Sequence, residues 1–136
     1  MSSLAGLRIL IVEDDALVAL NLQDFVEGLG CTVVGPVDRL SRALATLDTT
    51  HIDGAMLDIN LHGEMVYPLA ERLAEREIPM LFCSGYAFTS AVPPKFARYP
   101  QVAKPMVEHT LRTAMVETFG YLKAPPVNKE SALARA

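Results

Sequence analysis

Four short stretches of this sequence place acids, a hydroxyl or an amine directly after runs of apolar residues. The acids at 13–15 follow the first run, Asp58 follows the third, Ser84 the fourth and Lys104 the fifth. Carboxylates gathered in one place raise one another's pKa unless a cation neutralises them, and a hard cation with oxygen ligands suits that need. Mg²⁺ also accepts phosphate oxygens, so the set predicts a phosphoryl group held between Mg²⁺, Lys104 and Ser84.

The elements that position these residues alternate between strand and helix. Apolar, β-branched runs predict five strands, at 7–12, 31–34, 54–58, 80–84 and 102–103. Apolar residues at helical spacing predict helices over 16–29, 41–47 and 65–77, and a closing helix with Pro105 in its first turn that ends at Gly120. Gly35-Pro36 is expected to end the second strand. This alternation predicts an α/β fold with a parallel sheet, whose ligand chemistry gathers at the carboxyl ends of the strands.

The segment Tyr86–Pro100 does not follow this alternation, because three prolines interrupt it. We expect a loop there, with at most one or two short turns. One domain is expected over 1–123. The remainder, 124–136, contains two adjacent prolines and no aromatic residue, so a disordered tail is expected.

Composition narrows the class of protein. The chain has 136 residues, 51% hydrophobic and 21% charged, as expected of one soluble globular domain. A formal net charge of -4 without a basic run argues against direct binding of nucleic acid. The first apolar run is too short for a signal peptide or a membrane span, so we expect a cytoplasmic protein that does not bind membranes. Cys31 and Cys83 lie in predicted strands and are expected to be buried free thiols.

Four motifs resemble those of response regulator receiver domains, in the same order and at the same strand ends: IVEDD at 11–15, MLDIN at 56–60, FCSG at 82–85 and AKP at 103–105. The resemblance covers about residues 7–122. It implies a flavodoxin-like, doubly wound sheet of five parallel strands in the order 2-1-3-4-5. Together with the proline-rich segment, the FCSGY stretch resembles an alphaproteobacterial subgroup named for a Phe-Ala-Thr-Gly signature, in which the fourth helix is reduced and single-domain signalling is common.

The resemblance implies roles for the acidic residues. Asp58 would be the phosphoacceptor, and Asp14 and Asp58 would bind Mg²⁺ with help from Glu13 through water. Asn60 would contribute its backbone carbonyl. A histidine kinase or a histidine phosphotransfer protein would donate the phosphoryl group, and the domain would then regulate a protein partner or pass the phosphate on. Such a domain is a phosphoacceptor signalling protein rather than an enzyme, although it assists its own phosphorylation and dephosphorylation.

The resemblance also covers the switch, with two departures. Ser84 would hydrogen-bond a phosphoryl oxygen, where Thr is more usual, and Lys104 would pair with the phosphate. Gln101 stands where many receivers carry a Phe or Tyr that moves inward when the hydroxyl residue turns. Tyr86 or Phe88 could take the place of that aromatic residue, or either ring could simply cover the edge of the core.

Three further features bear on the first helix. Asp15 is interpreted as an N-terminal helix residue stabilised by the helix dipole. Leu17 and Leu20 fall off the apolar stripe of this helix and lie just after the acids. They suggest an apolar docking patch for a helix of the phosphodonor, although isolated exposed leucines are ordinary.

Two other classes of protein stay open as alternatives. A degenerate receiver could act as a phosphorylation-independent interaction module, and the missing aromatic at Gln101 leaves room for it. An aspartate-nucleophile phosphatase also uses Mg²⁺ and a strand-end Asp. That class would carry a second Asp two residues after Asp58, where Asn60 stands. A phosphate-loop protein would need a glycine-rich turn after the first strand, where this chain has acids.

Overall fold

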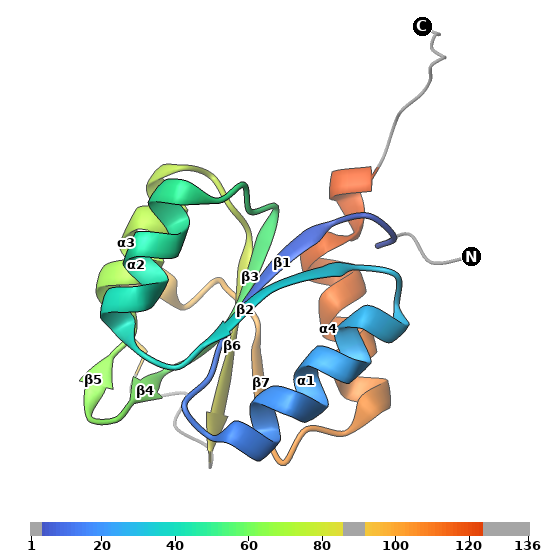
Figure 1. Cartoon of the computed structure of the whole chain (residues 1–136), viewed down its shortest axis with the longest axis horizontal. Coiled ribbons are helices and arrows are strands. Elements are labelled where there is room, and N and C mark those ends of the chain that lie inside the picture. The colour runs from blue at the N-terminus through green and yellow to red at the C-terminus, as the bar shows by residue number, and fades with distance from the viewer. Residues whose placement is uncertain (1–3, 86–91, 124–136) are drawn as a thin grey trace, which may run out of the picture.

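The computed structural model describes residues 4–85 and 92–123. In this part of the chain one sheet has five parallel strands in the order β2-β1-β3-β6-β7, which confirms the predicted order (Figure 1). The strands are β1 (Arg8–Val12), β2 (Thr32–Val37), β3 (Gly54–Asp58), β6 (Met80–Gly85) and β7 (Gln101–Lys104). The strand order reverses at β1 and β3, so this is the switch point where such sheets bind ligands.

Helices cover both faces of the sheet, as Figure 1 shows. α1 (Ala16–Gly28) and α4 (Glu108–Phe119) pack on one face, and α2 (Leu40–Thr49) and α3 (Tyr67–Glu75) on the other. A short turn, η3 (Gly120–Lys123), follows α4. Within the described residues, no helix has both the length and the apolar character that crossing a membrane requires.

The two faces of the sheet carry separate hydrophobic cores. Ile9 and Ile11 point toward α1 and α4, whereas Leu10 and Val12 point toward α2 and α3. A strand buried on both faces is apolar at every position, which explains why the runs in the sequence do not alternate. Cys31 and Cys83 are buried free thiols, as predicted.

Strand β2 passes through Gly35-Pro36, so the prediction that this pair ends the strand is wrong. The strand continues to Val37, which pairs with Val12 across a register shift. Gly35 has a φ of 95°, and a Cβ there would lie 2.8 Å from the backbone N of Val37. Only glycine fits this backbone without strain, and the irregularity carries the ladder up to the first acid of the site.

The predicted start of the third helix at Met65 is also wrong. Met65 belongs to a hairpin of β4 (Asn60–Leu61) and β5 (Glu64–Met65), and α3 begins only at Tyr67. The two turn residues, His62 and Gly63, have φ values of 51° and 90°. Positive φ at both central residues characterises the two-residue turns whose twist matches that of the strands they join.

The closing helix begins later than predicted. Pro105 lies outside it, since α4 starts at Glu108 after a loop. Between β6 and β7 the described residues contain a single short turn, η2 (Pro94–Phe96), in keeping with the predicted short fourth helix. Residues 86–91, with Tyr86 and Phe88, and the predicted tail lie outside the described residues.

Candidate functional site

Three carboxylates meet at the carboxyl ends of β1 and β3. Glu13 and Asp14 follow β1, Asp58 ends β3, and one side-chain oxygen from each lies within 4.8 Å of the other two. The Glu13 N–H donates to the Val37 carbonyl at 2.9 Å, which extends the ladder by one residue and directs the chain into the site. Glu13 and Asp58 are only 2% and 6% exposed, so water screens their charges poorly.

Lys104 supplies the positive charge of this acidic cluster of Glu13, Asp14 and Asp58. Its Nζ lies 2.8 Å from Glu13 Oε1 and 3.3 Å from Asp58 Oδ2. Burial alone would lower the pKa of Lys104, but the hydrogen bond to Glu13 and the charge of Asp58 raise that pKa above its ordinary value. The amine therefore stays protonated and is shared between two buried acids.

One amine does not neutralise three carboxylates, and the raised pKa of Asp58 reflects the excess negative charge. Burial, the hydrogen bond with Asp14 and the charge of Glu13 raise this pKa to about 7 despite Lys104. For Asp14 burial also acts upward, but a backbone hydrogen bond from His62 and the bond with Asp58 lower its pKa overall. A cluster of oxygens with surplus negative charge fits a hard divalent cation such as Mg²⁺.

The hairpin after β3 places Asn60 and His62 at the edge of the cluster. In this antiparallel hairpin, hydrogen-bonded pairs alternate with pairs that lack hydrogen bonds. Leu61 and Glu64 flank the turn, and Val66 N donates to the Ile59 carbonyl at 2.9 Å. The pair that lies between these two, Asn60 with Met65, is therefore a non-hydrogen-bonded pair. Its backbone carbonyl is directed out of the hairpin, as a cation ligand requires. The His62 N–H donates to Asp14 Oδ2 at 3.0 Å.

Sequence reasoning missed His62 because the residue does not follow an apolar strand. The only signal was a His-Gly pair four residues after Asp58, and that pair fits a tight turn only once a hairpin is suspected.

Ser84 is the hydroxyl of the site. It is buried near the end of β6 and pairs with Ala103, one register step beyond the pairing of Asp58 with Cys83. Gly85 pairs with Lys104 at the same end of the sheet. The predicted residues of β1, β3, β6 and β7 are thus brought to one edge, as the strand-end rule requires.

Gln101 lies opposite Phe82 at the start of β7, and its Oε1 is buried with no hydrogen-bond partner in the described part of the chain. Rings pack close by on the same face of the sheet. Tyr67 stacks on Phe96 with centroids 5.8 Å apart, and Phe82 lies 6.4 Å from Tyr99. This ring cluster of Tyr67, Phe82, Phe96 and Tyr99 was not anticipated from the sequence, because its members come from α3, β6, η2 and the loop before β7.

The first turn of α1 bears out two predictions. Asp15 caps the helix, and its Oδ1 accepts hydrogen bonds from the backbone N–H groups of Leu17 and Val18 at 2.9 and 3.1 Å. Leu17 and Leu20 are 67% and 53% exposed, so both lie off the buried stripe as predicted.

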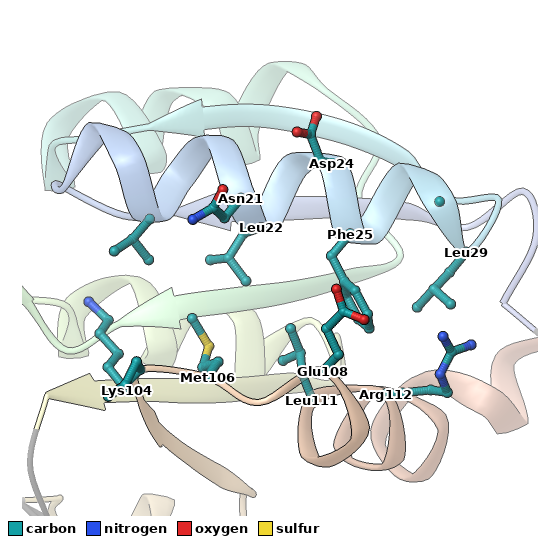
Figure 2. A pocket seen from close by; sticks show the side chains of 13 residues that line it. Asn21, Leu22, Asp24, Phe25, Leu29, Lys104, Met106, Glu108, Leu111 and Arg112 are labelled. Carbon is teal, nitrogen blue, oxygen red and sulfur yellow. The ribbon is translucent and has the colours of Figure 1, made fainter.

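A groove of about 670 Å³ separates α1 from the loop before α4 and from α4 itself. Figure 2 shows Leu22 and Phe25 reaching from α1 toward Met106 and Leu111 across it. Its lining also includes the polar side chains of Asn21, Asp24, Glu108 and Arg112. Lys104 lines the same groove, which therefore reaches the residue that contacts Asp58.

Comparisons with known proteins agree with this geometry. The family described as response regulator receiver domain matches residues 9–115. The solution structure of SdrG from Sphingomonas melonis Fr1 is 42% identical, covers 85% of this chain and 97% of its own, and gives a TM-score of 0.73. The BeF3-activated conformation of SdrG from Pseudomonas melonis Fr1 is 41% identical, with coverages of 82% and 95% and a TM-score of 0.71.

A more distant structure, the response regulator PhyR from Brucella abortus, shares the fold alone. It is 24% identical, with a TM-score of 0.72, and the match covers 96% of this chain and 54% of that one. Among curated proteins no match was found. The family match spans well over half of the sequence, and the chain therefore belongs to the response regulator receiver domain family.

Proposed function

We propose that this receiver accepts a phosphoryl group from a phosphohistidine onto Asp58, in a Mg²⁺-dependent reaction of a two-component or phosphorelay system. Receiver domains are signalling domains, so the product is a switched state rather than a released compound. The observation that supports the proposal best is the position of Asp58, buried among two other acids and 3.3 Å from Lys104 at the switch point of the sheet.

The residues around Asp58 fit the cation of this reaction. Asp14 and Asp58 would hold Mg²⁺, with Glu13 acting through water and Asn60 through its backbone carbonyl. Receiver domains bind Mg²⁺ through acidic residues of this kind. When bound, the ion supplies positive charge that offsets both the carboxylates and the phosphoryl oxygens.

In the proposed phosphoryl transfer, Asp58 is the nucleophile, and Lys104 and Ser84 bind the phosphoryl oxygens. A carboxylate oxygen of Asp58 attacks phosphorus, the new O–P bond forms and the P–N bond of the donor phosphohistidine breaks. The leaving imidazole keeps the electron pair of that bond. Lys104 pairs with the negative charge on the phosphoryl oxygens, and the Ser84 hydroxyl donates a hydrogen bond to one of them.

The acceptor assignment is tested by labelling with acetyl phosphate and Mg²⁺. We expect the wild type to carry acid-stable, alkali-labile phosphate and Asp58→Asn to carry none. Asp15→Asn is the matched control, since Asp15 is the neighbouring exposed acid, and Asn also caps helices well. Undiminished label on Asp58→Asn would end the assignment.

A second measurement separates the switch from a phosphorylation-independent interaction module. The relative SdrG has a BeF3-activated conformation, so the same reagent is the natural probe. With Mg²⁺ and beryllofluoride, amide NMR signals of residues flanking Ser84 and Lys104 should move in the wild type and stay in place in Asp58→Asn. Spectra that do not respond in the wild type would favour the module.

We further propose that the exposed face of α1 and the adjoining groove dock a helix of the phosphodonor protein. The groove has an apolar floor that includes Leu22, Phe25 and Leu111, and Lys104, which contacts the acceptor, also lines it. Leu17 stands exposed on the first turn of α1, immediately after the acids. A histidine on a helix seated there would be delivered toward Asp58.

Leu17→Asp tests this docking surface. We expect phosphotransfer from the protein donor to fall by at least about tenfold, the effect of losing one apolar anchor of about 1.4 kcal/mol, with acetyl phosphate labelling unchanged. Val116→Asp is the control, because Val116 is a 45% exposed apolar residue on α4 that belongs neither to α1 nor to the lining of the groove. Equal transfer rates for the wild type and Leu17→Asp would reject the patch.

A further inference from the structure

The turn between β4 and β5 ties His62 to the acidic cluster. His62 N–H donates to Asp14 Oδ2 at 3.0 Å, a bond that joins residues 48 positions apart in the sequence. Gly63 N–H donates to Asn60 Oδ1 at 2.8 Å and closes the turn on itself. The hairpin also begins two residues after Asp58, so His62 is held to the cluster through the chain on one side and by the bond to Asp14 on the other.

The imidazole of His62 stands at the mouth of the cluster. Its Nδ1 lies 3.9 Å from the same Asp14 oxygen, and the side chain is 51% exposed and therefore not locked by packing. Two atoms that bind one ion at about 2.1 Å each lie roughly 3 Å apart. A rotation that shortens the gap by about 1 Å would let the imidazole and Asp14 share a cation.

The backbone at this position does not call for histidine. Its φ of 51° is the left-handed region, where a turn followed by Gly favours Asn or Asp. Asn would serve the turn at least as well, so the imidazole contributes a nitrogen donor rather than a better turn.

We propose that His62 adds an imidazole ligand to the cation site, so that the affinity of the site for first-row transition ions such as Co²⁺ or Mn²⁺ is raised relative to its affinity for Mg²⁺. This inference rests on the proposed function, since it deepens the account of the same cation. Carboxylate and carbonyl oxygens suit Mg²⁺, whereas a neutral imidazole nitrogen binds the first-row transition metals better.

The other two histidines do not compete for this role. His51 Nε2 lies 2.8 Å from Asp53 Oδ1, and Asp53 accepts from the N–H of Arg8 at the start of β1, the opposite end of the sheet. His109 is exposed on α4. A nitrogen signal on the bound ion that vanishes with His62 is therefore assigned to that residue.

The test uses untagged protein loaded with Mn²⁺. Electron spin echo modulation should show a directly bound ¹⁴N in the wild type and none in His62→Asn, which keeps the turn and the backbone N–H. His62→Gly is a second variant that accepts the same φ, and His109→Asn is the control that keeps the signal. By competition titration, the preference for Mn²⁺ over Mg²⁺ should fall by at least about tenfold in both His62 variants.

The outcomes separate this inference from the proposed function. Mn²⁺ that binds without ¹⁴N coupling, or with coupling unchanged in His62→Asn, overturns the role of His62 and leaves the cation site standing. If Mn²⁺ and Mg²⁺ bind the wild type no better than Asp14→Asn, the cation site fails and the role of His62 fails with it.

Discussion

Asp58→Asn should stabilise the metal-free protein at neutral and alkaline pH. Burial and the neighbouring acids raise the pKa of Asp58 from its ordinary 3.8 to about 7. An acid whose pKa is higher in the folded state than in the unfolded chain binds its proton more tightly when folded. The stability linked to this group is therefore present below pH 4 and is lost as the pH rises from about 4 through about 7.

The magnitude follows from the same pKa. A rise from 3.8 to about 7 corresponds to about 4 kcal/mol of lost stability above pH 7, at 1.36 kcal/mol for each tenfold change in acidity. Asparagine removes this charge at nearly constant shape, but it also removes one partner of Lys104 at 3.3 Å. We therefore expect Asp58→Asn to gain about 2–4 kcal/mol at pH 8 and close to nothing at pH 4.5.

Urea denaturation in EDTA, followed by circular dichroism from pH 4.5 to 8, measures this difference. Added Mg²⁺ should stabilise the wild type in proportion to its occupancy and leave Asp58→Asn unmoved, which narrows the gap. Asp15→Asn, a change at the exposed neighbouring acid, should show neither effect. An Asp58→Asn protein no more stable than the wild type at pH 8 would refute the claim that surplus charge strains this site.

Two other changes test the supports of the site. Lys104→Met should destabilise the protein by about 3–5 kcal/mol at pH 7, because it leaves the buried Glu13 without the ammonium group that lies 2.8 Å away. Urea denaturation measures this loss, and an unchanged denaturation midpoint would contradict the prediction. Gly35→Ala should cost more than about 1 kcal/mol, since φ is 95° and the new Cβ meets the backbone N of Val37 at 2.8 Å. Gly28→Ala, with open space around it on α1, is the matched control and should be neutral or stabilising by the same assay.

The strand ends were predictable because each apolar run stops at a polar residue, and both signals are local. Asp58 and Lys104 could be placed at one sheet edge before any coordinates, since parallel strands present their carboxyl ends together. The five-strand order came from the resemblance to a family rather than from spacing. Nothing in a single apolar run says which other run it pairs with.

The structure differs from the sequence prediction where pairing with a distant strand, or a very short strand pairing, determines the local conformation. The local sequence Gly35-Pro36 predicts the end of a strand. Val37, beyond this pair, nevertheless pairs with Val12, and a bulge in the ladder accommodates the irregularity. The hairpin at 60–65 has strands of two residues, too short for any periodicity to register. Its position near the acids follows from the bond between His62 and Asp14, which no sequence window contains.

If Asp58 accepts a phosphoryl group as proposed, the charge balance of the site offers a way to transmit this event without an aromatic residue at position 101. Within residues 4–85 and 92–123, Lys104 is the only Lys or Arg paired with the acidic cluster, and it is already shared by Glu13 and Asp58. A phosphoryl group on Asp58 adds negative charge, so the amine must weaken its contact with Glu13 to meet it.

Lys104 ends β7, the strand that also carries Gln101, whose buried Oε1 has no hydrogen-bond partner among the described residues. A buried acceptor without a donor costs about 1–3 kcal/mol, so a shift of β7 that brings it a donor is favoured. Phe82 lies opposite Gln101 and belongs to the ring cluster that reaches η2. The route from Asp58 to the surface can therefore run through Lys104, β7 and these rings, without a ring at position 101.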